Sequence, residues 1–120
     1  MKTIIAIVGP SGSGKTHLVK FLKKELNIPT IVSYTNRPRR SGEQEGIDHY
    51  FLPASYPLPP SGEMLAYTHF AGYDYFALHN QVSDVISTYV IDEKGLEELS
   101  LFHSDKYQIV AVAVKCSEET

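Results

Sequence analysis

The strongest apolar pattern in the chain is the uninterrupted run at residues 3–8. A run without polar alternation is typical of a central parallel strand that is covered on both faces. A glycine-rich turn follows, and after Thr16 apolar side chains recur at helical spacing, at Leu18, Val19, Leu22 and Leu26. Lysines lie mainly on the other side of this expected helix, which ends at Asn27 and Pro29.

The rest of the pattern predicts short strands and two more helices. Strands are expected at residues 28–33, 50–51, 64–70, 73–77, 89–91 and 108–114. The inner face of the first helix is expected to carry Val82, Val85, Ile86 and Tyr89. The inner face of the second is expected to carry Leu96, Leu99 and Phe102. Four prolines exclude a regular helix between residues 51 and 62, and residues 37–46 are polar with two glycines, which predicts a loop. Strands that alternate with helices favour an α/β fold with a mainly parallel sheet.

Composition narrows the class of partner. The chain has 120 residues, enough for one domain with a sizeable core, and a net charge of -3. No overall basic field is present, so we expect no nucleic-acid polymer as a partner. The single cysteine, Cys116, forms no internal disulfide and fits a cytoplasmic location. No apolar run approaches a membrane span, so no membrane association is expected, and the pattern carries no signal for the oligomeric state.

A candidate phosphate-binding loop follows the first strand. Its residues fit the pattern G-x-x-x-x-G-K-S/T and are Gly9, Pro10, Ser11, Gly12, Ser13, Gly14, Lys15 and Thr16. Glycines let backbone N–H groups converge on a phosphate, and the helix N-terminus behind them adds a favourable dipole. Lys15 would reach the β- and γ-phosphates of a nucleoside triphosphate, and the Thr16 hydroxyl would hold Mg²⁺. The alternative is a strand-to-helix turn without a ligand, but the strand before it and the helix after it favour the phosphate loop.

Asp92 follows the expected strand at residues 89–91. In P-loop proteins an acidic group near the metal usually stands at such a strand end. An aspartate here can equally cap the next helix or form a turn. Both roles, metal ligand and cap, stay open for this residue.

All three arginines of the chain, Arg37, Arg39 and Arg40, lie within four residues. The planar guanidinium fork suits two phosphate oxygens at once. The cluster therefore predicts a second phosphate grip, although a solvated basic turn is the simpler alternative. A chain with two phosphate grips is suited to moving a phosphoryl group between two ligands.

The residues from Ser33 to Asp48 read S-x-T-x-R-x-x-R-x-G-E-x-x-G-x-D, which resembles the signature of guanylate kinases. Residues 70–75, F-x-G-x-x-Y, resemble a second block of that family, and the likeness runs in order from the P-loop to Val114. The resemblance implies a P-loop NTPase-type, three-layer α/β fold with a small β-rich insertion for the acceptor. It also implies a kinase that transfers a phosphoryl group from ATP to GMP with Mg²⁺.

Carried over by position, the resemblance implies that Ser33, Arg37, Arg40 and Tyr75 contact the acceptor phosphate. Lys15, Arg37 and Arg40 would then be the catalytic residues, and Thr16 and Asp92 the metal ligands. His49 stands where the family has a phosphate-binding tyrosine, and a histidine can also donate to phosphate. The positions that read guanine are Ala66 and Ala77 here, and an alanine accepts no guanine N–H. A different acceptor, another nucleotide or a sugar phosphate, therefore stays open.

The resemblance also implies a division of the chain. One guanylate kinase-like domain is expected over residues 1–120, with a core at 1–33 and 78–120 and the acceptor-binding insertion at 34–77. The family's lid and closing elements would follow the strand at 108–114, and no arginine lies beyond Arg40. We expect either a fragment of a longer enzyme or a naturally shortened relative with weak or no catalysis. A non-enzymatic binding module is the third alternative, which the intact Gly-Lys-Thr loop disfavours.

Overall fold

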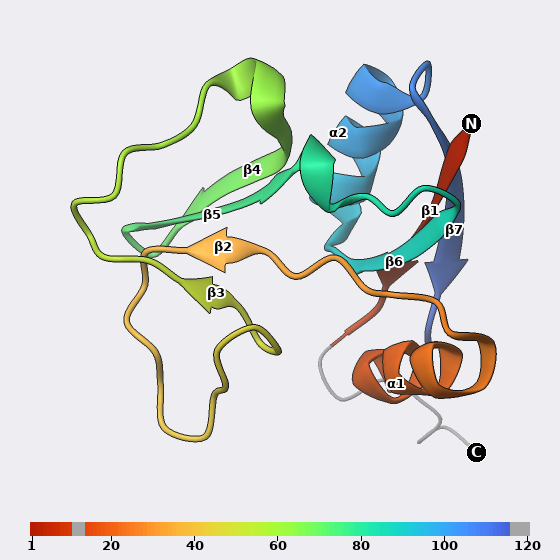
Figure 1. Ribbon diagram of the computed structural model, residues 1–120, viewed down its shortest axis with the longest axis horizontal. Coiled ribbons are helices and arrows are strands. Elements are labelled where there is room, and N and C mark those ends of the chain that lie inside the picture. Colours follow the sequence, from red (N-terminus) through yellow and green to blue (C-terminus); the bar gives the residue numbers. More distant parts are fainter. Residues whose placement is uncertain (11–13, 116–120) are drawn as a thin grey trace. The chain divides into compact units, whose positions relative to one another are not determined.

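The structure of the chain is a computed structural model that describes residues 1–10 and 14–115. The chain divides into two compact units (Figure 1). Unit 1 consists of Met1–Ile31 together with the chain from Val82 onward, and unit 2 is Val32–Gln81. The functional division into a core and an acceptor-binding insertion stays a prediction.

Unit 1 is built on a parallel sheet of three strands in the order β6-β1-β7. The strands are β1 (Lys2–Val8), β6 (Ile86–Val90) and β7 (Tyr107–Ala113). Residues 29–31 continue the sheet beside β6, because the Ile31 N–H donates to the Thr88 carbonyl at 2.7 Å and the Thr88 N–H donates to the Pro29 carbonyl at 2.9 Å. Two helices, α1 (Lys15–Leu26) and α2 (Glu93–His103), join these parallel segments.

The two helical crossovers run in opposite directions across this sheet. α1 leads from β1 to residues 29–31 on one side, and α2 leads from β6 to β7 on the other. Since such crossovers are right-handed, the two helices cover opposite faces and unit 1 has three layers (Figure 1). The reversal between β1 and β6 creates a crevice at the carboxyl ends of these strands, where open α/β sheets bind ligands.

The core of unit 1 forms around β1. Ile4, Ala6 and Ile7 are fully buried, and Leu99 of α2 is 1% exposed. α2 packs on β1 and β7. Helix α1 has no buried residue: on its predicted apolar face Leu18, Val19 and Leu22 are half-buried, whereas Leu26 is 62% exposed. The helix ends as predicted at Asn27, which adopts the left-handed conformation at φ 56° and donates its N–H to the Leu22 carbonyl.

Unit 2 is a small mixed sheet with the strand order β3-β2-β5-β4. Its strands are β2 (Tyr34–Thr35), β3 (Tyr50–Phe51), β4 (Met64–Phe70) and β5 (Tyr73–Leu78). Two short 3-10 turns, at Ser61–Glu63 and His79–Gln81, flank the hairpin β4-β5. The predicted strands at 50–51, 64–70 and 73–77 and the predicted loops are confirmed here.

The hairpin β4-β5 turns through Ala71 and Gly72, as the sequence predicts. Both residues have positive φ, 53° and 84°, which is the geometry of a two-residue type I′ turn. Glycine adopts this conformation freely, whereas alanine is strained in it.

Three predictions about the elements are wrong in whole or in part. No helix forms at residues 82–89: a 3-10 turn is followed by a loop and then by β6. Ser83 closes this loop, because its hydroxyl donates to the Ile86 carbonyl at 2.6 Å and its N–H donates to the Ser87 hydroxyl at 2.9 Å. The β-branched residues that follow favour the extended conformation and pair with β1. The apolar spacing was therefore a coincidence between a loop and a strand.

The other two differences concern pairing and burial. Of the strand expected at 28–33, only a single bridge at Thr30 forms, made by the Pro29 carbonyl and the Ile31 N–H, and Pro29 has no N–H with which to extend it toward Ile28. β7 forms where a strand was predicted, and its side chains are mostly exposed or half-buried, since it pairs with β1 alone among the described residues. Phe102 is 65% exposed rather than turned inward, because steps of three residues drift around a helix of about 3.6 residues per turn.

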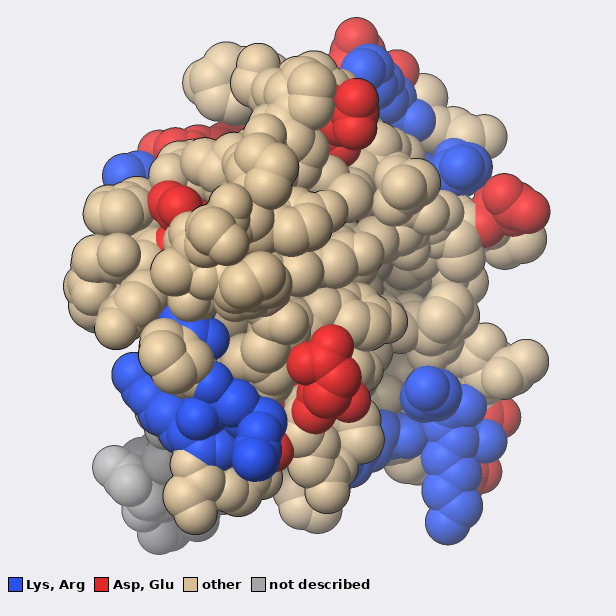
Figure 2. Space-filling model, turned by 60° about the vertical axis from the view of Figure 1, so that its left-hand side comes forward, with Lys and Arg blue, Asp and Glu red and all other residues tan. Residues whose placement is uncertain are grey.

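Charged side chains are spread over the surface. On the face drawn in Figure 2, basic and acidic side chains adjoin one another in several places, and uncharged surface covers much of the rest. Neither helix of the described part of the chain is long and apolar enough to cross a bilayer.

The turn at Ala71 gives a direct test of the hairpin. Ala71→Asn should raise the free energy of unfolding by about 0.5–1 kcal/mol, because asparagine tolerates the left-handed conformation better than alanine. Gly72→Ala should lower it by about 1 kcal/mol through strain alone, since no atom lies within 4 Å of the added methyl group. Urea denaturation would measure both. Equal stabilities of the three chains would contradict the type I′ turn.

Candidate functional site

The candidate triphosphate site lies at the carboxyl end of β1. Gly9 and Pro10 follow the strand, Ser11, Gly12 and Ser13 lie outside the described residues, and Gly14 leads into α1. Gly14 has φ 97°, a backbone conformation that residues other than glycine rarely adopt. The Lys15 ammonium donates a hydrogen bond to the Gly9 carbonyl, so the two described ends of the loop are held together. Thr16, the second residue of α1, is exposed.

A pocket of about 440 Å³ opens beside this loop, lined by Gly9, Pro10, Asp92, Glu93 and Lys94. It lies at the crevice that the reversed crossovers create between β1 and β6. The structure therefore brings Asp92 to the same pocket as the start of the predicted phosphate loop.

Asp92 is the N-cap of α2. Its carboxylate oxygen Oδ1 accepts a hydrogen bond from the Gly95 N–H at 2.7 Å. The capping role that the sequence left open is thus observed, and the same carboxylate lines the pocket.

The oxygen donors at this end of the sheet suit Mg²⁺. No group of three or more His, Cys, Asp or Glu residues that could hold a metal occurs in the described residues. Mg²⁺ in nucleotide sites needs only one or two protein oxygens, because phosphates and water complete its shell. The Thr16 hydroxyl and the Asp92 carboxylate are oxygen donors of this kind.

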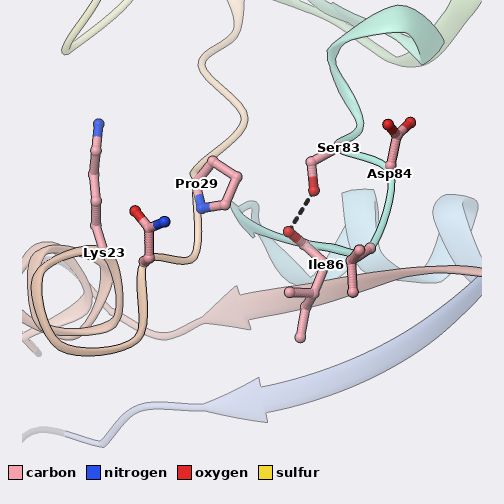
Figure 3. A pocket seen from close by; sticks show the side chains of 7 residues that line it. Lys23, Pro29, Ser83, Asp84 and Ile86 are labelled. Carbon is pink, nitrogen blue, oxygen red and sulfur yellow. Dashed lines mark hydrogen bonds between the residues drawn. The ribbon is translucent and has the colours of Figure 1, made fainter.

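A second pocket in unit 1, of about 400 Å³, lies beside the amino end of β6 (Figure 3). Lys23 and Asp84 stand on opposite sides of it, and Ser83 donates to the Ile86 carbonyl within it. None of the residues predicted from the sequence to bind nucleotide or metal lines this pocket.

The arginine cluster predicted to grip a second phosphate centres on Arg37, which is only 6% exposed. Its Nη1 and Nη2 donate to Oε1 and Oε2 of Glu43 at 3.0 and 2.9 Å, a bidentate ion pair. Its Nε donates to the Tyr75 hydroxyl at 3.1 Å, and Nη1 also donates to the Pro38 carbonyl at 3.0 Å. The guanidinium lies over the Phe51 ring, 5.9 Å from its centroid. The hydrogen bonds to Glu43, and to a smaller extent the one to Tyr75, raise the pKa of Arg37 above its ordinary range although burial opposes the shift.

Glu43 is the residue that reading the sequence for phosphate ligands missed. Besides the Arg37 fork, its Oε1 accepts the backbone N–H of Arg40 at 2.7 Å. The hydrogen bonds from Arg37 and from this N–H lower the pKa of Glu43 from 4.5 to about 2. The signals in the sequence were its place as the glutamate of the Ser33–Asp48 signature and its negative charge six residues after the first arginine.

The other two arginines differ from Arg37. Arg39 donates from Nη1 to the Glu43 carbonyl at 2.8 Å and so stabilises the loop between these two residues. The side chain of Arg40 is exposed, and the described residues give it no hydrogen bond or ion pair. Arg40 is thus the arginine whose fork is free to meet a ligand.

Ser33, His49 and Tyr75 gather beside Arg37. The Ser33 hydroxyl lies 3.0 Å from Nδ1 of His49, and the His49 ring lies 5.7 Å from the Tyr75 ring and 5.8 Å from the Phe51 ring. Burial and, after it, the charge of Arg37 lower the pKa of His49, so the imidazole is neutral near pH 7. A neutral imidazole still carries one N–H donor. The predicted acceptor residues Ser33, Arg37, His49 and Tyr75 therefore come together, with Arg40 on the adjoining loop.

The positions expected to read a base lie on the same sheet face as Tyr75. Ala66 of β4 is directly opposite Ala77 of β5, and Thr68 is opposite Tyr75. Because strand side chains alternate, these four share one face. Ala66 and Ala77 offer no carboxylate or amide beside Tyr75.

A polar network on the other face fixes the start of the arginine loop. Asn36 and Asp74 are joined twice, from Asn36 Nδ2 to Asp74 Oδ2 at 3.3 Å and from the Asp74 N–H to Asn36 Oδ1 at 2.9 Å. Tyr67 and His69 both contact Asp74 Oδ1, at 2.6 and 2.8 Å. Hydrogen bonding to His69 and then to Tyr67 lowers the pKa of Asp74. Thr35 completes the link, since its hydroxyl donates to the Asp74 carbonyl and accepts the Arg37 N–H.

Comparison with known proteins agrees with these motifs. Residues 1–99 match the guanylate kinase family model. The guanylate kinase of Thermotoga maritima is 36% identical over 87 residues, which are 70% of this chain and 42% of that protein. The guanylate kinase of Coxiella burnetii is 48% identical over 50 residues, which are 41% of this chain and 24% of that protein.

A solved structure is also similar to the chain. The crystal structure of guanylate kinase from Anaplasma phagocytophilum superposes with a TM-score of 0.67 at 27% sequence identity. The match covers 93% of this chain and 59% of that one. The chain thus spans less than two thirds of the length of each of these relatives.

The Glu43 carboxylate should leave a signature in the pH dependence of stability. Its pKa is lower in the folded chain than in the unfolded one, so its contribution is complete above about pH 4.5 and is lost as the pH falls toward about 2. Between these values the free energy of unfolding should fall more steeply for the wild-type chain than for Glu43→Gln. Urea titrations across this range would measure it, with Glu63→Gln, an exposed glutamate of unit 2, as the control. Parallel curves for wild type and Glu43→Gln would contradict the ion pair.

Proposed function

The chain belongs to the guanylate kinase family, and on this premise we propose that it transfers the γ-phosphoryl group of ATP to a nucleoside monophosphate, with GMP as the first acceptor to test. The observation that carries the proposal is the gathering of Ser33, Arg37, His49 and Tyr75 in unit 2. Guanidinium, hydroxyl and imidazole donors are the groups that hold a phosphate monoester. The same chain carries a Gly-Lys-Thr loop at a strand end in unit 1.

At the ATP end, we assign the triphosphate to residues 9–16. The backbone N–H groups of the loop and of the first turn of α1 would surround the phosphates, as the positive φ of Gly14 supports. Lys15 is held at the mouth of the loop by the Gly9 carbonyl, and a phosphate oxygen would replace that carbonyl as its partner.

Mg²⁺ is the metal that this chemistry calls for. When bound, it would offset the negative charge that develops on the phosphates during transfer. The Thr16 hydroxyl and the Asp92 carboxylate are the groups of this chain proposed to hold it. Asp92 can do so and still cap α2, because a carboxylate has two oxygens and the cap uses only Oδ1.

The acceptor phosphate is assigned to Ser33, Arg37, Arg40, His49 and Tyr75. In the reaction an oxygen of this phosphate attacks the γ-phosphorus of ATP, and the bond from that phosphorus to the β–γ bridging oxygen breaks, so that ADP leaves. The attacking oxygen is already ionised at neutral pH, so no general base is required. The task of the side chains is to position the oxygen and to offset the negative charge.

A different acceptor is the second candidate, and Ala66 and Ala77 are the observation that favours it. They face each other on the Tyr75 side of the sheet without a polar atom in either side chain. Guanine presents N–H donors that cost about 1–3 kcal/mol each when they are buried without an acceptor. A phosphorylated acceptor without such N–H donors would bind here without this cost in binding free energy.

The kinase proposal predicts GMP-dependent release of ADP from ATP. Lys15→Ala should lower kcat by roughly 10²–10³-fold, because one charge on the transferred phosphoryl group is removed. Lys20→Ala, on an exposed position of the same helix, should leave kcat unchanged. A coupled ADP assay would measure both. If ATP with GMP gives no ADP, and neither nucleotide raises the melting temperature, the proposal is wrong.

The two candidates for the acceptor differ in a ligand panel. If no side chain reads the base, GMP, AMP, dUMP and ribose 5-phosphate at equal concentration should raise the melting temperature to similar extents. Ala66→Glu would supply an acceptor for guanine N–H groups and should shift the preference toward GMP by about tenfold or more. Thr68→Glu adds the same charge on the same face and is the control. A strong preference of the wild type for GMP would reject the second candidate.

A further inference from the structure

The loop from Arg37 to Glu43 closes around a single carboxylate. Both oxygens of Glu43 are engaged by the Arg37 fork, and Oε1 also takes the Arg40 N–H. The turn is completed by the Glu43 N–H, which donates to the Arg40 carbonyl at 3.1 Å, and by Arg39 on the Glu43 carbonyl. All three arginines are therefore tied to the side chain or the backbone of this one residue.

The donors of Arg37 are largely used within the protein. A guanidinium has five N–H groups. Tyr75 takes the one on Nε, Pro38 and Glu43 take those on Nη1, and Glu43 takes one on Nη2. One N–H of Nη2 is left for a ligand, so Arg37 cannot present its fork to a phosphate while Glu43 stays in place.

Glu43 could therefore act on an incoming phosphate in two opposite ways. As a competitor, it would have to leave the fork before phosphate binds, and its removal would tighten binding. As a support, it would hold the loop in its binding shape, and its removal would weaken binding.

Burial favours the support. The Arg37 side chain is 6% exposed and that of Glu43 is 21% exposed, and separating a largely buried charge from its partner is strongly unfavourable. The Arg40 N–H would lose its acceptor in the same step. The exposed guanidinium of Arg40, by contrast, can bind a phosphate without first giving up another partner.

We propose that Glu43 is a positioning residue for the acceptor phosphate: it fixes Arg37 against Tyr75 and holds the Arg40 turn, so that the free Arg40 fork and the hydroxyls of Ser33 and Tyr75 meet the phosphate. This inference rests on the proposed function, since it concerns the same acceptor site. Arg37 then acts mainly through Tyr75, with one remaining N–H for the ligand. The Arg37 charge is offset by Glu43, and the attraction for the phosphate dianion comes chiefly from Arg40.

The sign of the change in affinity tests the proposal. Isothermal titration would measure the binding of GMP, inorganic phosphate and guanosine to the wild type, Glu43→Gln and Glu63→Gln. Glu43→Gln should weaken GMP and phosphate binding by about tenfold or more, because one bidentate partner and the Arg40 turn are lost. Guanosine binding and ATP binding should not change, which separates positioning from general loss of structure. Glu63→Gln should bind like the wild type.

Other results overturn the proposal. Unchanged or tighter phosphate binding by Glu43→Gln would make Glu43 a bystander or a competitor, and so would equal losses for guanosine and GMP. If Glu43→Gln does not fold, Arg40→Gln takes its place: phosphate binding that survives the loss of the Arg40 fork would also reject the proposal.

Failure of the proposed function looks different. Inorganic phosphate that binds to the wild type and is weakened by Glu43→Gln, without any ADP from ATP and GMP, would keep the positioning role and remove the kinase. ADP formation with a KM for GMP that Glu43→Gln leaves unchanged would keep the kinase and remove the positioning role. Absence of phosphate binding by the wild type would reject the grip that Glu43 is proposed to position.

Discussion

The structure of unit 2 depends on the ion pair between Arg37 and Glu43. A guanidinium that is 6% exposed needs a partner, and Glu43 meets it with two parallel hydrogen bonds. Arg37 Nε holds the Tyr75 hydroxyl in place by a hydrogen bond. The Glu43 carboxylate also accepts the Arg40 N–H and so closes the turn at Arg40. One interaction thus connects a strand of the sheet to a loop that has no regular structure of its own.

The alternation of side chains along β5 separates two tasks. Tyr75 and Ala77 point to the face of the candidate acceptor site, whereas Asp74 and Phe76 point to the other. Asp74 anchors the start of the arginine loop through Asn36, while its neighbour Tyr75 receives Arg37. A register slip of one residue would exchange these faces and separate Tyr75 from Arg37. The short turn at Ala71 and Gly72 therefore has a functional consequence, because it fixes that register.

The sequence predicted the elements best where local signals and tertiary pairing agree. The run at 3–8, the helix that ends at Asn27 and the turn at Ala71 each carry such a signal, whereas the phosphate grip at the clustered arginines stays a prediction. The helix expected at residues 82–89 failed because apolar spacing cannot distinguish a loop followed by a strand from a helical face. The link from Arg37 to Glu43 could not be predicted either, because it depends on how an irregular loop folds back on itself.

The two candidate sites differ in what has to be held in place. A triphosphate loop relies on backbone N–H groups, and glycines such as Gly14 allow its geometry. A short sequence motif is therefore enough to identify it. A site made of side chains relies on long, charged groups that lose rotamer freedom when they are fixed. Each group therefore needs partners that hold it in place, and the sequence motif does not identify these partners. Arg37 and Arg39 have such partners, whereas Arg40 extends freely. Arg40 is the arginine whose side chain has no partner among the described residues, while the two arginines before it are both held by Glu43.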